Sequence, residues 1–140
     1  MAYFEIVAHR GITAEEPENT LPAFQRAIEL GADAIELDVR LTSDHVPVVY
    51  HYYYLHLNTS ASGAIFEYTF DRLQGVRVRS RTNTNADGAK IPSLTEVLEA
   101  VGGRIGLEIE IKGPEPESPA IIGDVLHQFK HLWQTIEITS

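Results

Sequence analysis

Two stretches of alternating residues constrain the fold of this chain more than any other feature of its sequence. Residues 34–41 read AIELDVRL, and residues 104–112 read RIGLEIEIK. Because successive side chains of a strand point to opposite faces, each stretch predicts a β-strand with one apolar face and one face that carries carboxylates. Parallel strands that helices cover are usually apolar on both faces. The charged face therefore predicts a polar site, as at the inner top of a barrel.

Three helices are expected around these strands, at residues 20–31, at 93–103 and from Ser118 onward. Thr20 is a candidate N-cap of the first, and Ser93 with Glu96 predicts a capping box for the second. Ser118 is expected to cap the third helix, with proline following in its first turn. The buried face of that helix is expected to include Trp133.

Three further strands are expected at residues 4–9, 46–51 and 135–139, and the sequence TSDH before the second of them predicts a tight turn. Residues 52–91 are polar and irregular, which indicates an insertion outside the sheet core. The basic run RVRSR at 77–81 within it is interpreted as a solvated loop. Strands that alternate with helices in this way predict a parallel α/β sheet with helical crossovers.

Size and composition exclude several classes of protein. The 140 residues amount to about one domain, and the absence of cysteine excludes disulfides and thiolate metal sites. The net charge of −9, without a dense cluster of lysine and arginine, argues against a nucleic-acid partner. We see no apolar run long enough to span a bilayer and no secretory signal, so a cytoplasmic location is expected.

Seven residues with chemically useful side chains lie near the ends of the predicted strands: His9, Arg10, Glu36, Asp38, His51, Glu110 and Lys112. The carboxyl ends of parallel strands meet at one rim, so these side chains are expected to converge. Three carboxylates without a cysteine ligand suit Mg²⁺ or Ca²⁺ better than Zn²⁺. Arginine and lysine suit a phosphate group, and two histidines suit a general acid and a general base.

Each of these residues alone also has a simpler interpretation. A strand carboxylate usually faces solvent, a lone histidine is usually structural, and Lys112 could merely pair with Glu110. His127 and His131 lie four residues apart, a spacing that can bind zinc. No glutamate follows His127, so a solvated helical face is the preferred interpretation of that pair.

The combined pattern resembles the glycerophosphodiester phosphodiesterase family, in which H-R is followed by E-x-D, H-D and a later E-x-K. The corresponding segments here are AHRG with PENTLPAF, IELDVRLTSDHVPVVYH, IPSL and IEIK. The resemblance covers essentially the whole chain. It implies a TIM-barrel-type (β/α)₈ architecture with a small insertion, a divalent cation, and hydrolysis of a small-molecule phosphodiester to glycerol 3-phosphate and an alcohol.

The resemblance also implies roles for single residues. Glu36, Asp38 and Glu110 would bind the metal, His9 and His51 would act as general acid and base, and the phosphate would be held by Arg10 and Lys112. Which histidine takes which role stays open, as does whether water or a substrate hydroxyl attacks first.

Two positions depart from the family pattern. Tyr52 follows His51 where the family has aspartate, and Leu57 stands where the family has arginine, although Thr59 keeps its place. Loss of the aspartate could free the orientation of the His51 ring or shift its pKa, so reduced or altered activity is one expectation. The aromatic run at 52–54 is interpreted either as a substrate wall or as packing of the insertion.

Length is the other departure, because a barrel of this type needs about 250 residues. The chain is expected to form one domain, about half of a barrel, with an insertion at 52–91. Such a half-barrel leaves two open sheet edges. We expect self-association, with two copies closing one eight-stranded barrel about a two-fold axis. A truncated fragment would instead be marginally stable or prone to aggregation.

Two rival functions stay open from the sequence. One is a binding module that keeps the cation and a phosphate ligand without turnover. The other is a related phosphodiesterase that acts on lysophospholipid or sphingolipid head groups. The latter ranks lower because the sequence shows no long apolar flap for a lipid tail.

Overall fold

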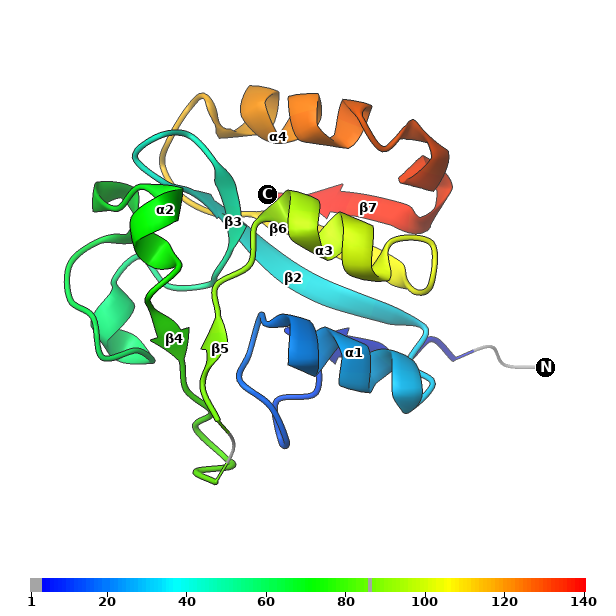
Figure 1. Cartoon of the computed structure of the whole chain (residues 1–140). Helices are drawn as coiled ribbons and strands as arrows, with labels where there is room; N and C mark the ends of the chain where they lie inside the picture. The colour runs from blue at the N-terminus through cyan, green and yellow to red at the C-terminus, as the bar shows by residue number, and fades with distance from the viewer. Residues whose placement is uncertain (1–3, 86) are drawn as a thin grey trace.

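A parallel β-sheet forms the centre of the computed structural model, which describes residues 4–85 and 87–140 (Figure 1). Its parallel strands lie in the order β1-β2-β6-β7. Their bounds are β1 Val7–His9, β2 Ala34–Leu41, β6 Gly106–Ile111 and β7 Ile136–Thr139. A short strand β3 (Pro47–Val49) turns back from β2 and pairs with it antiparallel. The predicted order of strands and helices is confirmed, and so is the parallel sheet.

Helices cover one face of this sheet. They are α1 (Leu21–Glu29), α3 (Leu94–Val101) and α4 (Ser118–His127). Their apolar side chains share one buried core with the odd-numbered residues of β2 and β6. The alternation of β2 therefore sends Ile35, Leu37 and Val39 toward the helices and Glu36 and Asp38 to the opposite face.

Local sequence signals explain where α3 begins and where α1 ends. The Ser93 hydroxyl accepts a hydrogen bond from the backbone N–H of Glu96 at 3.0 Å, and the Glu96 carboxylate accepts one from the backbone N–H of Ser93 at 3.0 Å. The predicted capping box is thus present. The first helix ends before Gly31, whose φ of +79° suits a residue without a side chain.

Two predictions for the third helix are wrong. Its N-cap is Glu117, while Ser118 lies inside the helix, buried and without a hydrogen bond from its hydroxyl among the described residues. Trp133 is 46% exposed, because α4 stops at His127 and the chain continues as the 3₁₀ helix η3 (Lys130–Thr135). This change of period turns the indole away from the core.

The strand at residues 4–9 is shorter than predicted, and so is the one at 46–51. His127 and His131 are both exposed, as the solvated interpretation predicted.

The insertion has structure of its own beside the sheet, at the left and lower left of Figure 1. Its elements are η1 (Leu55–Leu57), η2 (Ile65–Glu67), α2 (Phe70–Leu73) and the antiparallel pair β4 (Arg77–Val78) and β5 (Ala89–Lys90). They share a second apolar cluster with the end of the β2–β3 hairpin: Val48, Tyr50, Leu55, Ile65, Leu73, Val78 and Ile91. The insertion therefore packs around its own apolar cluster outside the main core, but it is not irregular throughout, contrary to the prediction. No helix in the described part of the chain has the length and apolarity to cross a membrane.

The glycine that follows His9 and Arg10 is expected to be essential for packing β1 against α1. A Cβ on Gly11 would lie 2.6 Å from the Cβ of Ala23, whereas a Cβ on Gly31 would meet nothing within 4 Å. Both glycines have positive φ, so Gly31→Ala measures the backbone strain alone, about 1 kcal/mol. Gly11→Ala adds an overpacking cost and should lose roughly 3 kcal/mol of unfolding free energy. Equal losses in urea denaturation would contradict this explanation.

Candidate functional site

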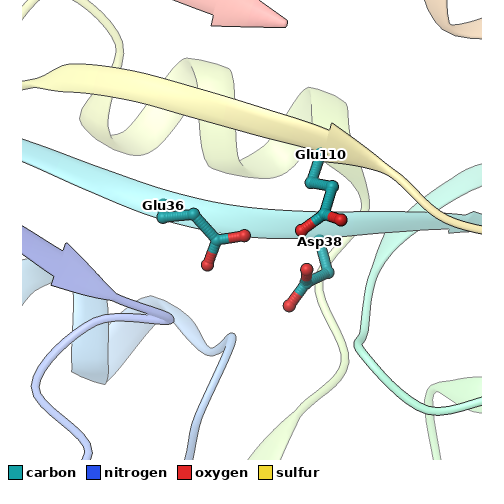
Figure 2. Close-up of side chains that lie close together, drawn as sticks. All are labelled: Glu36, Asp38 and Glu110. Carbon is teal, nitrogen blue, oxygen red and sulfur yellow. The ribbon is translucent and has the colours of Figure 1, made fainter. Parts of the chain in front are cut away.

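Three carboxylates converge on the sheet face opposite the helices (Figure 2). Glu36 and Asp38 lie two residues apart on β2, and Glu110 lies on the adjacent strand β6, in register with Asp38. Oxygen atoms from the three groups lie within 4.8 Å of one another. We call these three residues the acidic trio. The predicted convergence is present because parallel register between β2 and β6 places the carboxylates side by side.

Hydrogen bonding within the trio is incomplete. Asp38 is 1% exposed, yet its Oδ1 and both carboxyl oxygens of Glu36 are buried and accept no hydrogen bond from any described residue. Buried polar atoms nearly always have a partner. Unpaired carboxylate oxygens in a group this compact, without nitrogen or sulfur donors, fit a hard dication such as Mg²⁺ or Ca²⁺.

The two carboxylates of β2 have opposite pKa shifts. Burial, and next the negative charge of Asp38, raises the pKa of Glu36 to about 8. Burial also acts to raise the pKa of Asp38, but a hydrogen bond from Asn19 and the charges of His51 and Arg10 outweigh it and lower the pKa. In metal-free protein the negative charge of the pair is therefore favoured on Asp38, and Glu36 favours its protonated form.

Arg10 connects β1 to the trio. Its guanidinium lies 3.2 Å from the Asp38 carboxylate and 2.8 Å from that of Glu18. Its backbone has a φ of +60° and its N–H donates to the Glu36 carbonyl at 2.8 Å. Such a conformation is unfavourable for arginine, and the hydrogen bond at the end of β1 helps to hold the side chain over Asp38.

His51 is oriented by the groups on both sides of its ring. Its Nδ1 lies 3.2 Å from the Asp38 carboxylate, and its Nε2 lies 3.2 Å from a guanidinium nitrogen of Arg10. Arginine can only donate, so Nε2 is the acceptor and Nδ1–H donates to Asp38. The Tyr52 ring meets the imidazole edge to face at 4.8 Å between centroids. These contacts hold the ring without the aspartate that the family pattern has at position 52.

Each predicted basic residue contacts one member of the trio. The His9 side chain is 68% exposed and its Nε2 lies 3.4 Å from Glu36, while Lys112 pairs with Glu110 at 2.9 Å. All seven predicted residues therefore lie together, along β2 and at or just after the carboxyl ends of β1, β3 and β6. The pairing of Lys112 with Glu110 is the simple interaction that the sequence also allowed.

Sequence reasoning did not assign a role to several residues next to this group. Buried Asn19 donates from Nδ2 to Asp38 at 3.0 Å, and Glu18 pairs with Arg10. Arg79 and Arg81, which were interpreted as part of a solvated loop, are exposed but line a pocket beside Arg10. That interpretation is incomplete because contacts between distant segments, which local composition does not reveal, place the loop here. The motif ENT was the available signal for the first two residues.

Known proteins resemble this chain in sequence. The model of the family described as "Glycerophosphoryl diester phosphodiesterase family" matches residues 9–132. A glycerophosphodiester phosphodiesterase of Caldanaerobacter subterraneus is 41% identical over 108 residues, which cover 76% of this chain and 44% of that protein. The chain spans about half the length of the relatives it matches.

Solved structures give the same result. The crystal structure of a glycerophosphodiester phosphodiesterase from Agrobacterium tumefaciens matches with a TM-score of 0.88 and 30% identity, covering 99% of this chain and 58% of that one. A phosphodiesterase of Oleispira antarctica, solved in complex with the product sn-glycerol-3-phosphate, matches with a TM-score of 0.82 and 28% identity, over 96% and 64%. Such neighbours are TIM-barrel proteins, and the parallel sheet of this chain matches part of a barrel.

The raised pKa of Glu36 predicts a pH-dependent stability in metal-free protein. Native Glu36 keeps a proton that the unfolded chain releases near pH 4.5, so the wild type should lose stability as pH rises from about 4.5 to about 8. Glu36→Gln removes this dependence and should gain thermal stability relative to the wild type over the same range. Circular-dichroism melts in EDTA measure it, with Glu99→Gln, at an exposed glutamate of α3, as control. A difference between wild type and variant that does not change with pH would contradict the assignment.

Proposed function

The chain belongs to the glycerophosphoryl diester phosphodiesterase family, and from this premise we propose that it takes part in metal-dependent hydrolysis of glycerophosphodiesters to glycerol 3-phosphate and an alcohol. The observation that supports the proposal most directly is the acidic trio, whose buried oxygens lack hydrogen-bond partners among the described residues. The Oleispira antarctica relative, solved with sn-glycerol-3-phosphate as its product, supports the same reaction.

Glu36, Asp38 and Glu110 would hold the cation. A bound dication supplies Lewis-acid polarisation of a phosphoryl oxygen and offsets the mutual repulsion of the carboxylates. The oxygen-only donor set favours Mg²⁺ or Ca²⁺. The choice between these two ions stays a prediction, as does the cytoplasmic location expected from the sequence.

The basic residues around the trio account for the remaining steps. Arg10 and Lys112 would donate hydrogen bonds to the phosphate oxygens. When Arg10 turns to the phosphate, the Nε2 lone pair of His51 becomes free, while Asp38 continues to hold Nδ1–H. One of His9 and His51 would remove a proton from the attacking oxygen, of water or of a substrate hydroxyl, as that oxygen bonds to phosphorus, and the other would protonate the alcohol oxygen as its bond to phosphorus breaks. If a substrate hydroxyl attacks first, water then opens the cyclic phosphate to glycerol 3-phosphate.

A module that binds phosphate without turnover is the main alternative function. Tyr52, in place of the family's aspartate, is the observation in its favour. The contacts of His51 with Asp38 and Tyr52 argue against it, because they orient the ring without that aspartate. Phosphate-ligand binding without release of glycerol 3-phosphate would support the alternative.

Loss of one trio carboxylate should weaken metal binding and lower turnover together. Asp38→Asn or Glu110→Gln should weaken Mg²⁺ and Ca²⁺ binding in calorimetry by more than the roughly tenfold effect of losing an outer hydrogen-bond partner. Release of glycerol 3-phosphate should fall in parallel.

Glu99→Gln is the control for these variants, since Glu99 is an exposed glutamate on α3, away from the trio and from the outer strands of the sheet. It should bind metal and turn over substrate as the wild type does. Unchanged metal affinity in the two trio variants would overturn the assignment.

We further propose that the chain self-associates through the edges of its sheet, with β7 of one copy beside β1 of another. The two outer strands carry exposed apolar side chains, with Val7 37% exposed on β1 and Ile138 49% exposed on β7. Unpaired edges of this kind favour pairing with a further strand. Two copies related by a two-fold axis would close one barrel of eight parallel strands.

Size-exclusion chromatography with light scattering tests this arrangement. The expected mass is twice the 15.6 kDa of one chain. Ile138→Lys should give a monomer, because it places a charge at the proposed strand pairing. Leu30→Lys, at an exposed apolar residue after α1, should leave the dimer intact. A stable wild-type monomer would contradict the proposal.

A further inference from the structure

A pocket of about 210 Å³ opens beside the candidate site. Two of its lining residues, His9 and Arg10, also contact the acidic trio. The rest of its wall is polar or charged and comes from Thr13, Glu16, Glu18, Tyr52, Arg79, Arg81 and Thr82. A phosphodiester with its phosphate at Arg10 and the trio would extend one of its two ester arms into this pocket.

The pocket is held in shape by contacts between segments far apart in the sequence. The Thr82 hydroxyl donates to the Thr13 carbonyl, and the Asn83 amide donates to the Glu15 carbonyl at 3.0 Å. The backbone N–H of Arg79 donates to the Asn58 carbonyl at 2.9 Å. The insertion is thereby fixed against the loop that follows β1, and its two arginines face the pocket.

The positive charges of Arg79 and Arg81 are free to bind an anionic ligand. Arg10 is paired with two carboxylates, whereas neither Arg79 nor Arg81 forms an ion pair within residues 4–85 and 87–140. Arg81 donates to the Leu57 carbonyl at 2.8 Å and lies over the Tyr52 ring at 5.1 Å. One wall of the pocket therefore attracts an anion.

Glu16 and Glu18 add the opposite charge to the same pocket. Glu18 is paired with Arg10, whereas the Glu16 carboxylate has no ion-pair partner in the described part of the chain. A pocket with both signs suits a group that carries both signs. It does not suit a quaternary ammonium, because Arg81 already covers the aromatic face that such a cation would need. A glycerol arm offers only hydroxyl groups, so it has no anionic group that could pair with the two guanidinium groups.

We propose that this pocket is a subsite for an alcohol that carries a carboxylate and an ammonium group, as the serine of glycerophosphoserine does. Arg79 and Arg81 bind the carboxylate, and Glu16 binds the ammonium. The inference rests on the proposed function, since it places the phosphate of the diester at Arg10 and the trio. It adds the class of alcohol, which the family assignment leaves open.

Two monoesters test the subsite without depending on turnover. O-Phospho-L-serine and phosphocholine each join a phosphate to the alcohol in question and lack the diester bond. Calorimetric titration into the full chain with Ca²⁺ should give roughly tenfold tighter binding of O-phospho-L-serine, the size expected for charge-assisted hydrogen bonds. Arg79→Gln combined with Arg81→Gln should abolish this preference. Arg104→Gln, an exposed arginine at the end of α3, should preserve it.

Glycerol 3-phosphate separates failure of the subsite from failure of the function. Equal affinity of the wild type for the two monoesters, with glycerol 3-phosphate still bound, would overturn the subsite and leave the proposed function standing. Failure to bind any of the three phosphate esters would overturn the proposed function and the subsite with it. Because the first comparison uses the wild type, it does not depend on how the variants fold.

Discussion

Repulsion between three carboxylates on adjacent strands is the constraint on which the rest of the site depends. Coulomb energies rise steeply in a desolvated environment, so the chain must neutralise or protonate these groups. Arg10, His51 and Asn19 support the charge of Asp38, and Lys112 pairs with Glu110. Glu36 has no comparable support and keeps its proton instead, through a pKa raised by burial and by Asp38. The same arrangement prepares the three groups for a dication, which would replace both the proton and the pairing cations.

The register of two strands decides whether this constraint arises at all. Asp38 lies opposite Glu110 in the parallel pairing of β2 with β6. A slip of β2 by one residue would move Glu36 and Asp38 to the helix-covered face, where Ile35, Leu37 and Val39 are fully buried. Packing of apolar side chains under α1, α3 and α4 thus fixes the position of the polar site on the other face. The alternation of apolar and acidic residues along β2 and β6 therefore produces both the buried core on one face of the sheet and the acidic site on the other.

The insertion determines how far the site extends beyond the sheet. Tyr52 packs against His51 and under Arg81, so one aromatic ring joins the histidine to the pocket wall. The position where the family has arginine holds Leu57, yet Arg81 donates to the backbone carbonyl of that residue. A guanidinium from a different part of the insertion therefore lies near this position. The Arg81 side chain thus contacts both positions that depart from the family pattern, Tyr52 and Leu57.

The sequence by itself determined the strand and helix order, the alternation on β2 and β6, the capping box of α3 and the seven residues that converge on the rim. These follow from local periodicity and from the rule that parallel strands end together. The end of α4 and the exposure of Trp133 depended on a change from α to 3₁₀ geometry that apolar spacing does not reveal. Only the tertiary structure placed Asn19 on Asp38, oriented His51 through Arg10, and brought Arg79 and Arg81 to the pocket. Those contacts join segments up to about 70 residues apart, and pairing over such distances is set by how the elements pack rather than by the residues next to each other in the chain.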